Sequence, residues 1–313
     1  MQSQDKRVMI LGTGGTIAGR AASAADNVGY TAGQISAAAL IAAVPPLAGQ
    51  LIEAEQVAQV DSKDMDVAVW QHLVARAAHH LARDEVAAVV VTHGTDTLEE
   101  TAWLLHRVLA PNKPLVLTAA MRPASSLQAD GPQNLLDAVA VAQHDGAAGV
   151  VVVMGGLVHS AANVRKAHSY RVDAFDSGDA GPLAVIEEGH LRLFRPWPRG
   201  AVALGQSLIE RDPGLWPWVE LLTSHAAARG AAVDALVAAG VRGLVVAGTG
   251  NGTLHQALQS ALLRAQAQGV AVRLATRCAA GPVLGLEWPA YEGLSAVKAR
   301  LELTLELLKP ASN

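Results

Sequence analysis

Short runs of apolar, largely β-branched residues recur along the first half of the chain, and each is followed by a glycine-containing turn. They read VMILGTGG, VAAVVVTHGTD, PLVLTAAMRP and GVVVVMGG, and a related run, GLVVAGTGNG, follows much later. Continuous apolar runs of this length are typical of strands that are buried on both faces of a parallel sheet. The pattern therefore predicts a parallel sheet with helices on both faces.

Helical periodicity separates these runs. DMDVAVWQHLVARAAHHLA and DTLEETAWLLHRVLA carry apolar residues three and four positions apart, as an amphipathic helix does. In the second segment Thr97 precedes Glu100 by three residues, which predicts a capping box. Asp130 and Gln133 flank Pro132 in a similar arrangement, so they predict the start of a helix over PQNLLDAVAVA.

Residues 189–218 interrupt this alternation with four prolines, four glycines and three tryptophans. A second strand and helix series follows, from VELLTS through GLVVAGTGNG and VAVRLATR to the helix LSAVKARLELTLELL. We predict an N-terminal domain over 1–190, a linker over 191–215 and a C-terminal domain over 216–313. The expected fold class is α/β: a larger N-terminal domain with a parallel or mixed sheet of the flavodoxin-like type, and a smaller C-terminal α/β domain.

Composition supports a folded protein that acts on small molecules. Hydrophobic residues make up 51% of the 313 residues and charged residues 17%, which excludes a disordered chain. The formal net charge of −4 and a pI near 6.2 carry no basic footprint for nucleic acid or an anionic membrane. We therefore expect a small-molecule partner, with no nucleic acid and no membrane as partners.

The reactive and metal-binding residue types are sparse. Cys278 is the single cysteine, so neither an internal disulfide nor a cysteine metal cluster is expected, and we interpret it as a packed thiol. The eleven histidines contain no HExxH pattern, and His79 and His80 are adjacent rather than one turn apart. No metal site is predicted.

The first residues, MQSQDKR, are polar and lead directly into a strand, without the apolar stretch of a secretory signal. No run approaches the roughly 18 apolar residues that span a bilayer. A cytoplasmic location is the expectation, although a mature fragment of a secreted precursor would look the same.

The turn in VMILGTGGTIAG places glycines and hydroxyls where ligands bind at the carboxyl ends of parallel strands. Gly12, Gly14 and Gly15 allow a tight turn and close approach to a ligand. A dinucleotide-binding GxGxxG would need a glycine at Ile17, and the Lys-Ser/Thr pair of a P-loop is absent. The turn alone leaves a structural and a binding role open.

The stretch VVVTHGTDTLEE repeats this design, with a glycine turn, hydroxyls and the carboxylate of Asp96 before a helix. A hydroxyl is a poor nucleophile at neutral pH, so threonine chemistry needs a base or lysine nearby and donors for the developing oxyanion. The backbone amides of both turns could supply those donors. His93 adjoins the turn, and we interpret it as structural.

The segments TGGTIAG, THGTDTLEETA and AAMRPASSLQADGPQNL resemble, in order and spacing, the signatures of the bacterial-type L-asparaginase family. The resemblance covers most of the chain and is strongest in the first 170 residues. It implies that Thr16 is the nucleophile that forms an acyl-enzyme ester, and that Tyr30, on a mobile loop, assists Thr16. The small, polar stretch RAASAADNVG is itself typical of such a lid.

The resemblance also implies a second group of catalytic and binding residues. Thr95, Asp96 and Lys166 would form a polar triad that positions water or substrate and moves protons. Ser62 and Asp96 would hold the α-carboxylate and α-ammonium groups of the substrate. The carbonyl of Ala120 would contact the substrate amide.

Gly15 would line the same substrate site. The family needs no cofactor for this route, and none is expected here. Its members are tetramers built from two dimers, so the resemblance implies a homotetramer.

Three positions depart from the family pattern. Lys63 follows Ser62, where relatives often carry a neutral or acidic residue, and a cation there would oppose binding of an ammonium unless it points away. Thr253 stands where relatives have an asparagine that reaches the neighbouring subunit. The segment TRCAAGPVLGLEWPAYEG is short, and Glu287 is the candidate for the glutamate that acts on the loop tyrosine.

The first functional hypothesis is an amidohydrolase that converts L-asparagine to L-aspartate and ammonia. The alternatives are a glutaminase-asparaginase of broader specificity, the ammonia-generating subunit of a tRNA-dependent amidotransferase, and a non-catalytic amino-acid-binding module. Asparagine and glutamine differ by one methylene, which is worth only about 1 to 3 kcal/mol in a pocket, so the preferred amide stays open.

Overall fold

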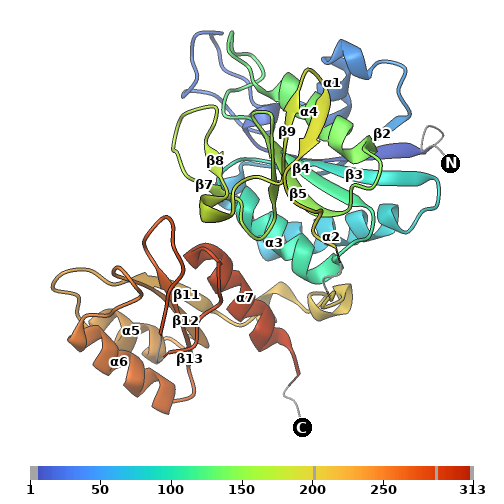
Figure 1. Ribbon diagram of the computed structural model, residues 1–313. Coiled ribbons are helices and arrows are strands. Elements are labelled where there is room, and N and C mark those ends of the chain that lie inside the picture. Colours follow the sequence, from blue (N-terminus) through green and yellow to red (C-terminus); the bar gives the residue numbers. More distant parts are fainter. Residues whose placement is uncertain (1–5, 200–201, 286–287, 311–313) are drawn as a thin grey trace. The chain divides into compact units, whose positions relative to one another are not determined.

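The computed structural model describes residues 6–199, 202–285 and 288–310 (Figure 1). The chain divides into two compact units, one ending at Gln206 and the other beginning at Ser207. Within the first unit, eight strands form one mixed sheet in the order β10-β9-β6-β5-β4-β3-β1-β2. These strands are β1 (Arg7–Gly14), β2 (Ile52–Val60), β3 (Val86–Thr92), β4 (Pro114–Thr118), β5 (Gly149–Met154), β6 (Leu157–Ser160), β9 (Ala184–Glu187) and β10 (His190–Leu193).

The five strands from β2 to β5 in this order run parallel, whereas β6, β9 and β10 add antiparallel strands at one edge. The predicted α/β class is thereby confirmed, with a sheet that is mixed rather than purely parallel. A separate two-stranded ribbon joins β7 (Arg165–Lys166) to β8 (Phe175–Asp176). The apolar pattern did not predict the antiparallel strands β6, β9 and β10, because each has only four residues.

Helices cover both faces of the large sheet. The helices α1 and α4 lie on one face, and α2 and α3 lie on the other (Figure 1). Their bounds are α1 (Ala37–Ala42), α2 (Val67–Leu81), α3 (Leu98–Leu109) and α4 (Gly131–Gln143). Because helices cover both faces of the central strand β3, its residues Val89, Val90 and Val91 are all fully buried. Each such side chain contributes about 1.5–3 kcal/mol by its burial.

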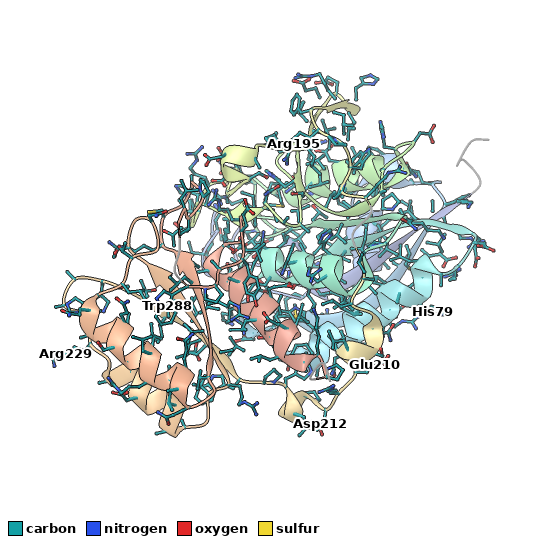
Figure 2. The ribbon with its side chains drawn as sticks, turned by 60° about the horizontal axis from the view of Figure 1, so that its bottom comes forward. His79, Arg195, Glu210, Asp212, Arg229 and Trp288 are labelled. Carbon is teal, nitrogen blue, oxygen red and sulfur yellow. The ribbon has the colours of Figure 1, made fainter. Side chains whose placement is uncertain are left out.

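The second unit is a three-stranded parallel sheet in the order β11-β12-β13. Its elements are β11 (Val219–Thr223), α5 (Ala231–Ala238), β12 (Gly243–Gly248), α6 (Gln256–Ala267), β13 (Ala271–Thr276) and α7 (Ala296–Leu308). Apolar residues of α5 and α6 pack on one face of this sheet, and Trp288 joins that core (Figure 2). The other face packs against Ala299 and Leu303 of α7.

Short 3₁₀ helices complete the chain. They are η2 (Thr16–Ala18), η3 (Pro45–Leu47), η4 (Ser62–Asp64), η5 (Gly178–Ala180), η6 (Gln206–Leu208) and η7 (Pro213–Leu215). Cys278 is exposed, so the expectation of a packed thiol was wrong. It lies in the loop after β13, where its backbone N–H donates to the Thr276 hydroxyl at 3.0 Å. Over the described residues, no helix is both long and apolar enough to cross a membrane.

A part-buried ion cluster joins β2 to α2. Glu55 accepts hydrogen bonds from Arg76 Nε at 2.6 Å and from Arg76 Nη2 at 3.0 Å, and it contacts His80 Nε2 at 2.7 Å. His80 is buried, whereas the adjacent His79 is exposed on the outer side of α2 (Figure 2). Hydrogen bonding from Arg76 is the largest influence that lowers the pKa of Glu55, to about 2.

We expect Glu55→Gln to lower the free energy of unfolding at pH 7 by about 3 kcal/mol, since 2.5 pH units separate about 2 from 4.5. The pKa of Glu55 is lower in the folded state, so its contribution is complete above about pH 4.5 and is lost as the pH falls toward 2. The difference in unfolding free energy between the wild type and Glu55→Gln should therefore narrow below pH 5. Urea unfolding followed by tryptophan fluorescence at several pH values measures it.

Glu187→Gln is the matched control, because Glu187 and Arg192 form an ion pair whose side chains are 61% and 62% exposed. We expect its unfolding free energy to stay within about 0.5 kcal/mol of wild type. Equal losses in the two variants, or a loss at Glu55 that does not vary with pH, would contradict the assignment.

Candidate active site

The register of three parallel strands brings distant turns to one edge of the large sheet. Gly12 of β1 pairs with Thr92 of β3, which in turn pairs with Thr118 of β4. The segments that follow these residues therefore leave the sheet side by side. They are the two glycine turns and the AAMRP segment, which the sequence analysis selected separately.

The two glycine turns touch through their backbones. Gly15 has a φ of +76°, and a Cβ built there would lie 2.3 Å from the Cα of Gly94. A Cβ on Gly94 would lie 2.4 Å from the hydroxyl oxygen of Ser62. Any side chain would push the turns apart, so both positions need glycine for close approach.

The amide of Gly15 is already used in the fold. Its N–H donates to the carbonyl of Val60 at 2.9 Å, at the end of the neighbouring strand β2. The expectation that this turn offers amides to an oxyanion therefore does not extend to the N–H of Gly15. Its contribution to the site is the close approach of its backbone to Gly94.

A lysine, a threonine and an aspartate meet at this edge. Lys166 Nζ donates to Thr95 Oγ1 at 2.9 Å and to Asp96 Oδ1 at 2.6 Å. Lys166 belongs to the ribbon strand β7, 70 residues beyond Asp96. The Lys166 side chain is 19% exposed and that of Asp96 is 51% exposed, so the ion pair lies at the border between protein and solvent.

Thr16 and Tyr30 form a second polar pair. Thr16 is buried at the start of η2, and its hydroxyl lies 2.7 Å from the hydroxyl of Tyr30. Tyr30 belongs to the predicted lid, whose two ends are joined by paired backbone hydrogen bonds between Arg20 and Thr31. The lid thus brings the tyrosine hydroxyl onto the threonine that the sequence analysis predicts to be the nucleophile.

Ser62 connects the second turn to the end of β2. Its buried hydroxyl accepts a hydrogen bond from the backbone N–H of Asp96 at 3.2 Å. Thr97 donates its hydroxyl to the carbonyl of Ser62 at 2.8 Å and makes no side-chain cap on α3. The predicted capping box with Glu100 is therefore wrong, because the threonine is used to tie two turns together.

Lys63 points away from this arrangement. Its ammonium group contacts Asp61 at 3.3 Å and Asp64 at 2.5 Å, and its side chain is 60% exposed. The hydrogen bond to Asp64 is the main cause that raises the pKa of Lys63. The charge that departs from the family pattern is thus neutralised locally.

The segment after β4 carries Ala120 and is held by side chains of α4. Asp130 accepts hydrogen bonds from the backbone N–H groups of Met121 at 3.0 Å and Arg122 at 2.9 Å. Asn134 donates to the carbonyl of Ala119 at 3.0 Å. Asp130 makes no side-chain cap, so this second capping prediction is also wrong, and Asn134 is a residue that sequence reasoning missed.

His93 is fully buried next to the second turn. Its Nδ1–H donates to the carbonyl of Gly94 at 2.7 Å, and its backbone N–H donates to the carbonyl of Thr118 at 2.9 Å. Burial lowers the pKa of His93 to about 4, so the imidazole is neutral near pH 7. The lysine and the carboxylate therefore supply the charge beside this turn.

Thr253 and Glu287 are the two candidates from the C-terminal half of the chain. The Thr253 hydroxyl lies 2.9 Å from that of Thr249, where both follow β12. Glu287 lies outside the described residues. Within the described part of the chain, no group of three or more His, Cys, Asp or Glu side chains could hold a metal ion.

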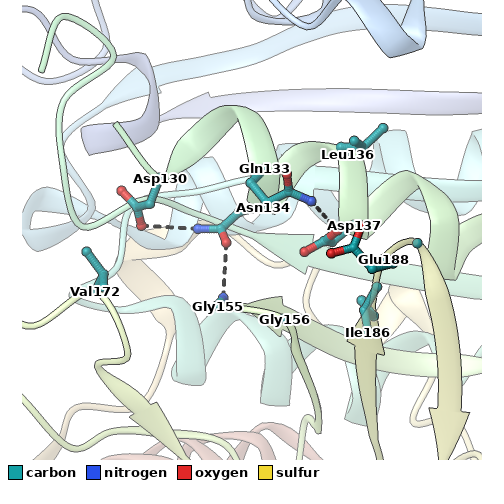
Figure 3. A pocket seen from close by; sticks show the side chains of 11 residues that line it. Asp130, Gln133, Asn134, Leu136, Asp137, Gly155, Gly156, Val172, Ile186 and Glu188 are labelled. Atoms are coloured by element: carbon teal, nitrogen blue, oxygen red, sulfur yellow. Dashed lines mark hydrogen bonds between the residues drawn. The ribbon is translucent and has the colours of Figure 1, made fainter. Parts of the chain in front are cut away.

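A cavity of about 620 Å³ borders α4, and it contains none of the predicted catalytic residues (Figure 3). Its lining is acidic and apolar, with Asp137 buried beside Gln133, which donates to it at 2.8 Å. Burial raises the pKa of Asp137. Asp130 and Asn134 line this cavity (Figure 3), and they also bind the backbone of Met121 and Ala119 on either side of Ala120.

Hydroxyls, a lysine and a carboxylate thus lie together at the carboxyl edge of the large sheet, as threonine chemistry requires. The family Asparaginase, N-terminal matches residues 7–199, and the Glutaminase/Asparaginase C-terminal domain matches residues 218–308. The chain belongs to the asparaginase/glutaminase family of amidohydrolases.

Known relatives cover almost the whole chain. L-asparaginase 2 of Bacillus subtilis is 35% identical over 96% of this chain and 82% of its own. A glutaminase-asparaginase of Pseudomonas fluorescens is also 35% identical, over 96% of this chain and 86% of its own. The crystal structure of a probable cytoplasmic L-asparaginase from Campylobacter jejuni matches with a TM-score of 0.88 and 37% identity, covering 98% of this chain and 96% of that one.

We expect Gly15→Ala to lower amide hydrolysis more than 100-fold and to destabilise the fold by about 3 kcal/mol or more, because its Cβ would meet backbone. Gly49→Ala is the matched control, since Gly49 has a similar φ of +79° and nothing within 4 Å of its Cβ position. It should cost only about 1–2 kcal/mol and leave activity intact. Equal effects of the two substitutions on activity and on the free energy of unfolding would contradict the role of the contact between Gly15 and Gly94.

Proposed function

We propose that this protein hydrolyses L-asparagine to L-aspartate and ammonia through a threonine acyl-enzyme intermediate. The observation that carries the proposal is the shared position of Thr16, Lys166 and their hydroxyl partners at one edge of the sheet. Membership of the asparaginase/glutaminase family supports an amide of an amino acid as substrate.

The hydrogen bonds suggest where each proton goes. Thr16 Oγ1 attacks the amide carbon while its proton passes through the Tyr30 hydroxyl, 2.7 Å away, to the leaving nitrogen. The carbon–nitrogen bond breaks, ammonia leaves and an ester with Thr16 remains. Water then attacks the ester carbon, the ester bond to Thr16 breaks, and the proton from water restores the threonine hydroxyl.

Thr95 is suited to position that water. Its oxygen accepts a hydrogen bond from Lys166, so its own hydroxyl hydrogen is free to point toward the reacting group. Asp96 holds the ammonium of Lys166 at 2.6 Å, which fixes the direction of this donor. A charged donor makes a stronger hydrogen bond than a neutral one, so this pair orders the hydroxyl.

Ser62 and Asp96 are suited to hold the two charged groups of the α-carbon. The hydroxyl of Ser62 accepts from the N–H of Asp96, which leaves its hydrogen free to donate to a carboxylate. Lys166 contacts Oδ1 of Asp96, and the half-exposed carboxylate offers Oδ2 to an incoming ammonium. Ala120 would contact the substrate amide, on a segment that Asp130 holds in place.

The same chemistry serves glutamine, and one relative is named a glutaminase-asparaginase at 35% identity. We keep broader specificity as the second candidate function. We also propose a cytoplasmic location and a homotetramer. Light scattering on the purified protein tests the tetramer. The ammonia assay below separates an enzyme from a non-catalytic amino-acid-binding module.

Thr16→Ala and Thr95→Ala should each lower ammonia release from L-asparagine at least 1,000-fold, because each removes a hydroxyl that the reaction needs. Ser260→Ala is the control: Ser260 is exposed on α6, where its hydroxyl donates to the carbonyl of Gln256, and activity should be unchanged. A coupled enzymatic assay measures the rate of ammonia release by the wild type and the three variants. Wild-type turnover in either threonine variant would remove the mechanism, and aspartate binding without any turnover in the wild type would favour the binding module.

Comparison of kcat/KM for asparagine and glutamine decides between the two amidohydrolase candidates. One methylene changes transition-state binding by about 1 to 3 kcal/mol, so an asparaginase should prefer asparagine by about 10- to 200-fold. A ratio below about three would favour the glutaminase-asparaginase candidate.

A further inference from the structure

The lid that carries Tyr30 is clasped by a segment from a distant part of the chain. Four hydrogen bonds connect residues 19–27 of the first segment to residues 124–127 of the second. They join the Ala124 N–H to the Gly19 carbonyl, the Ala21 N–H to the Ser125 hydroxyl, the Ser126 hydroxyl to the Asn27 side chain, and the Leu127 N–H to the Ala24 carbonyl.

Little else in the described structure anchors the lid. No residue from Arg20 to Thr31 is buried, and Val28 near the tip is 77% exposed. Leu127 on the clasping segment is also 84% exposed, so neither Val28 nor Leu127 adds much apolar burial to the lid. A segment that is held by a few solvent-accessible hydrogen bonds belongs to the least stable part of a fold, and it can open while the rest stays intact.

Hydrogen bonds hold the chain on both sides of the clasping segment, residues 124–127. On one side it continues from Met121 and Arg122, whose N–H groups are bound by the Asp130 carboxylate at 3.0 and 2.9 Å. On the other side it leads into α4, where Asn134 holds the carbonyl of Ala119 at 3.0 Å. The lid is therefore the moving partner, and residues 124–127 are the fixed one.

We propose that residues 124–127 are a latch that holds the lid closed, with Ser125 and Ser126 as positioning residues for Tyr30. Ser125 accepts from Ala21 at 2.9 Å near the base of the lid, and Ser126 donates to Asn27 at 2.6 Å close to Tyr30. Closure of this latch keeps the tyrosine hydroxyl within 2.7 Å of Thr16. The kinetic role of the latch rests on the proposed amidohydrolase function, whereas its hold on the lid does not.

Trypsin tests the hold on the lid without any assay of activity. Arg20 is the only lysine or arginine between Arg7 and Lys63, and cleavage after it breaks the bond to Ala21, whose N–H Ser125 binds. In the double variant Ser125→Ala/Ser126→Ala, cleavage at Arg20 should be about tenfold faster, measured by mass spectrometry of the released peptide. Ser125→Thr/Ser126→Thr keeps both hydroxyls and should restore the wild-type rate.

Steady-state kinetics test the role in closure. Loss of the latch lowers the closed fraction before substrate binds, so KM for L-asparagine should rise about tenfold. Bound substrate adds its own contacts to the closed lid, so kcat should stay within about threefold. The threonine double variant should again behave like the wild type, whereas general misfolding would lower kcat in both double variants.

Ser23→Ala is the matched control, because Ser23 is an exposed lid serine whose hydroxyl accepts only from within the lid, from the Ala25 N–H at 3.3 Å. It should leave both the cleavage rate and KM unchanged. Cleavage of the alanine double variant at the wild-type rate would overturn the latch, whatever the enzyme hydrolyses. If the wild type releases no ammonia, the proposed function fails, and the trypsin result still decides whether the latch holds the lid.

Discussion

The structure depends on the register of three buried parallel strands and on the backbone contact that this register permits. Gly12, Thr92 and Thr118 are level with one another, so the following turns meet at one edge. Gly15 and Gly94 then pack without side chains between them. Burial on both sheet faces fixes this register, because a slip would displace the strands' apolar side chains from the packed helices.

The site combines residues on the sheet edge with Tyr30 on a weakly held lid. Lys166 and Asp96 neutralise each other beside the second glycine turn, and burial keeps His93 uncharged, so the charge beside that turn comes from one ion pair. Tyr30 comes from the exposed lid, where hydrogen bonds take the place of a hydrophobic core. In the proposed mechanism, substrate entry needs the lid to open, and attack by Thr16 needs Tyr30 to return to it.

Much of the fold was readable from local pattern. The predicted strands β1, β3, β4, β5 and β12 are confirmed, and so are the helices α2, α3, α4 and α7. Strand β2 was missed because its sequence, IEAEQVAQV, is half polar and only Val57 is buried. The strands β6, β9 and β10 were missed because each has only four residues, and β6 pairs with β9 across a long stretch of sequence. The exact domain boundaries and the roles of the site residues stay predictions.

The sequence by itself determined the α/β class, the buried strands, the two glycine turns and the family, because each of these depends on residues close together in the chain. Only the tertiary structure decided what the polar side chains contact. Thr97 and Asp130 looked like helix caps, yet one binds the Ser62 carbonyl and the other binds the Met121 and Arg122 amides. A polar side chain near a helix start has several possible partners, and long-range packing selects among them.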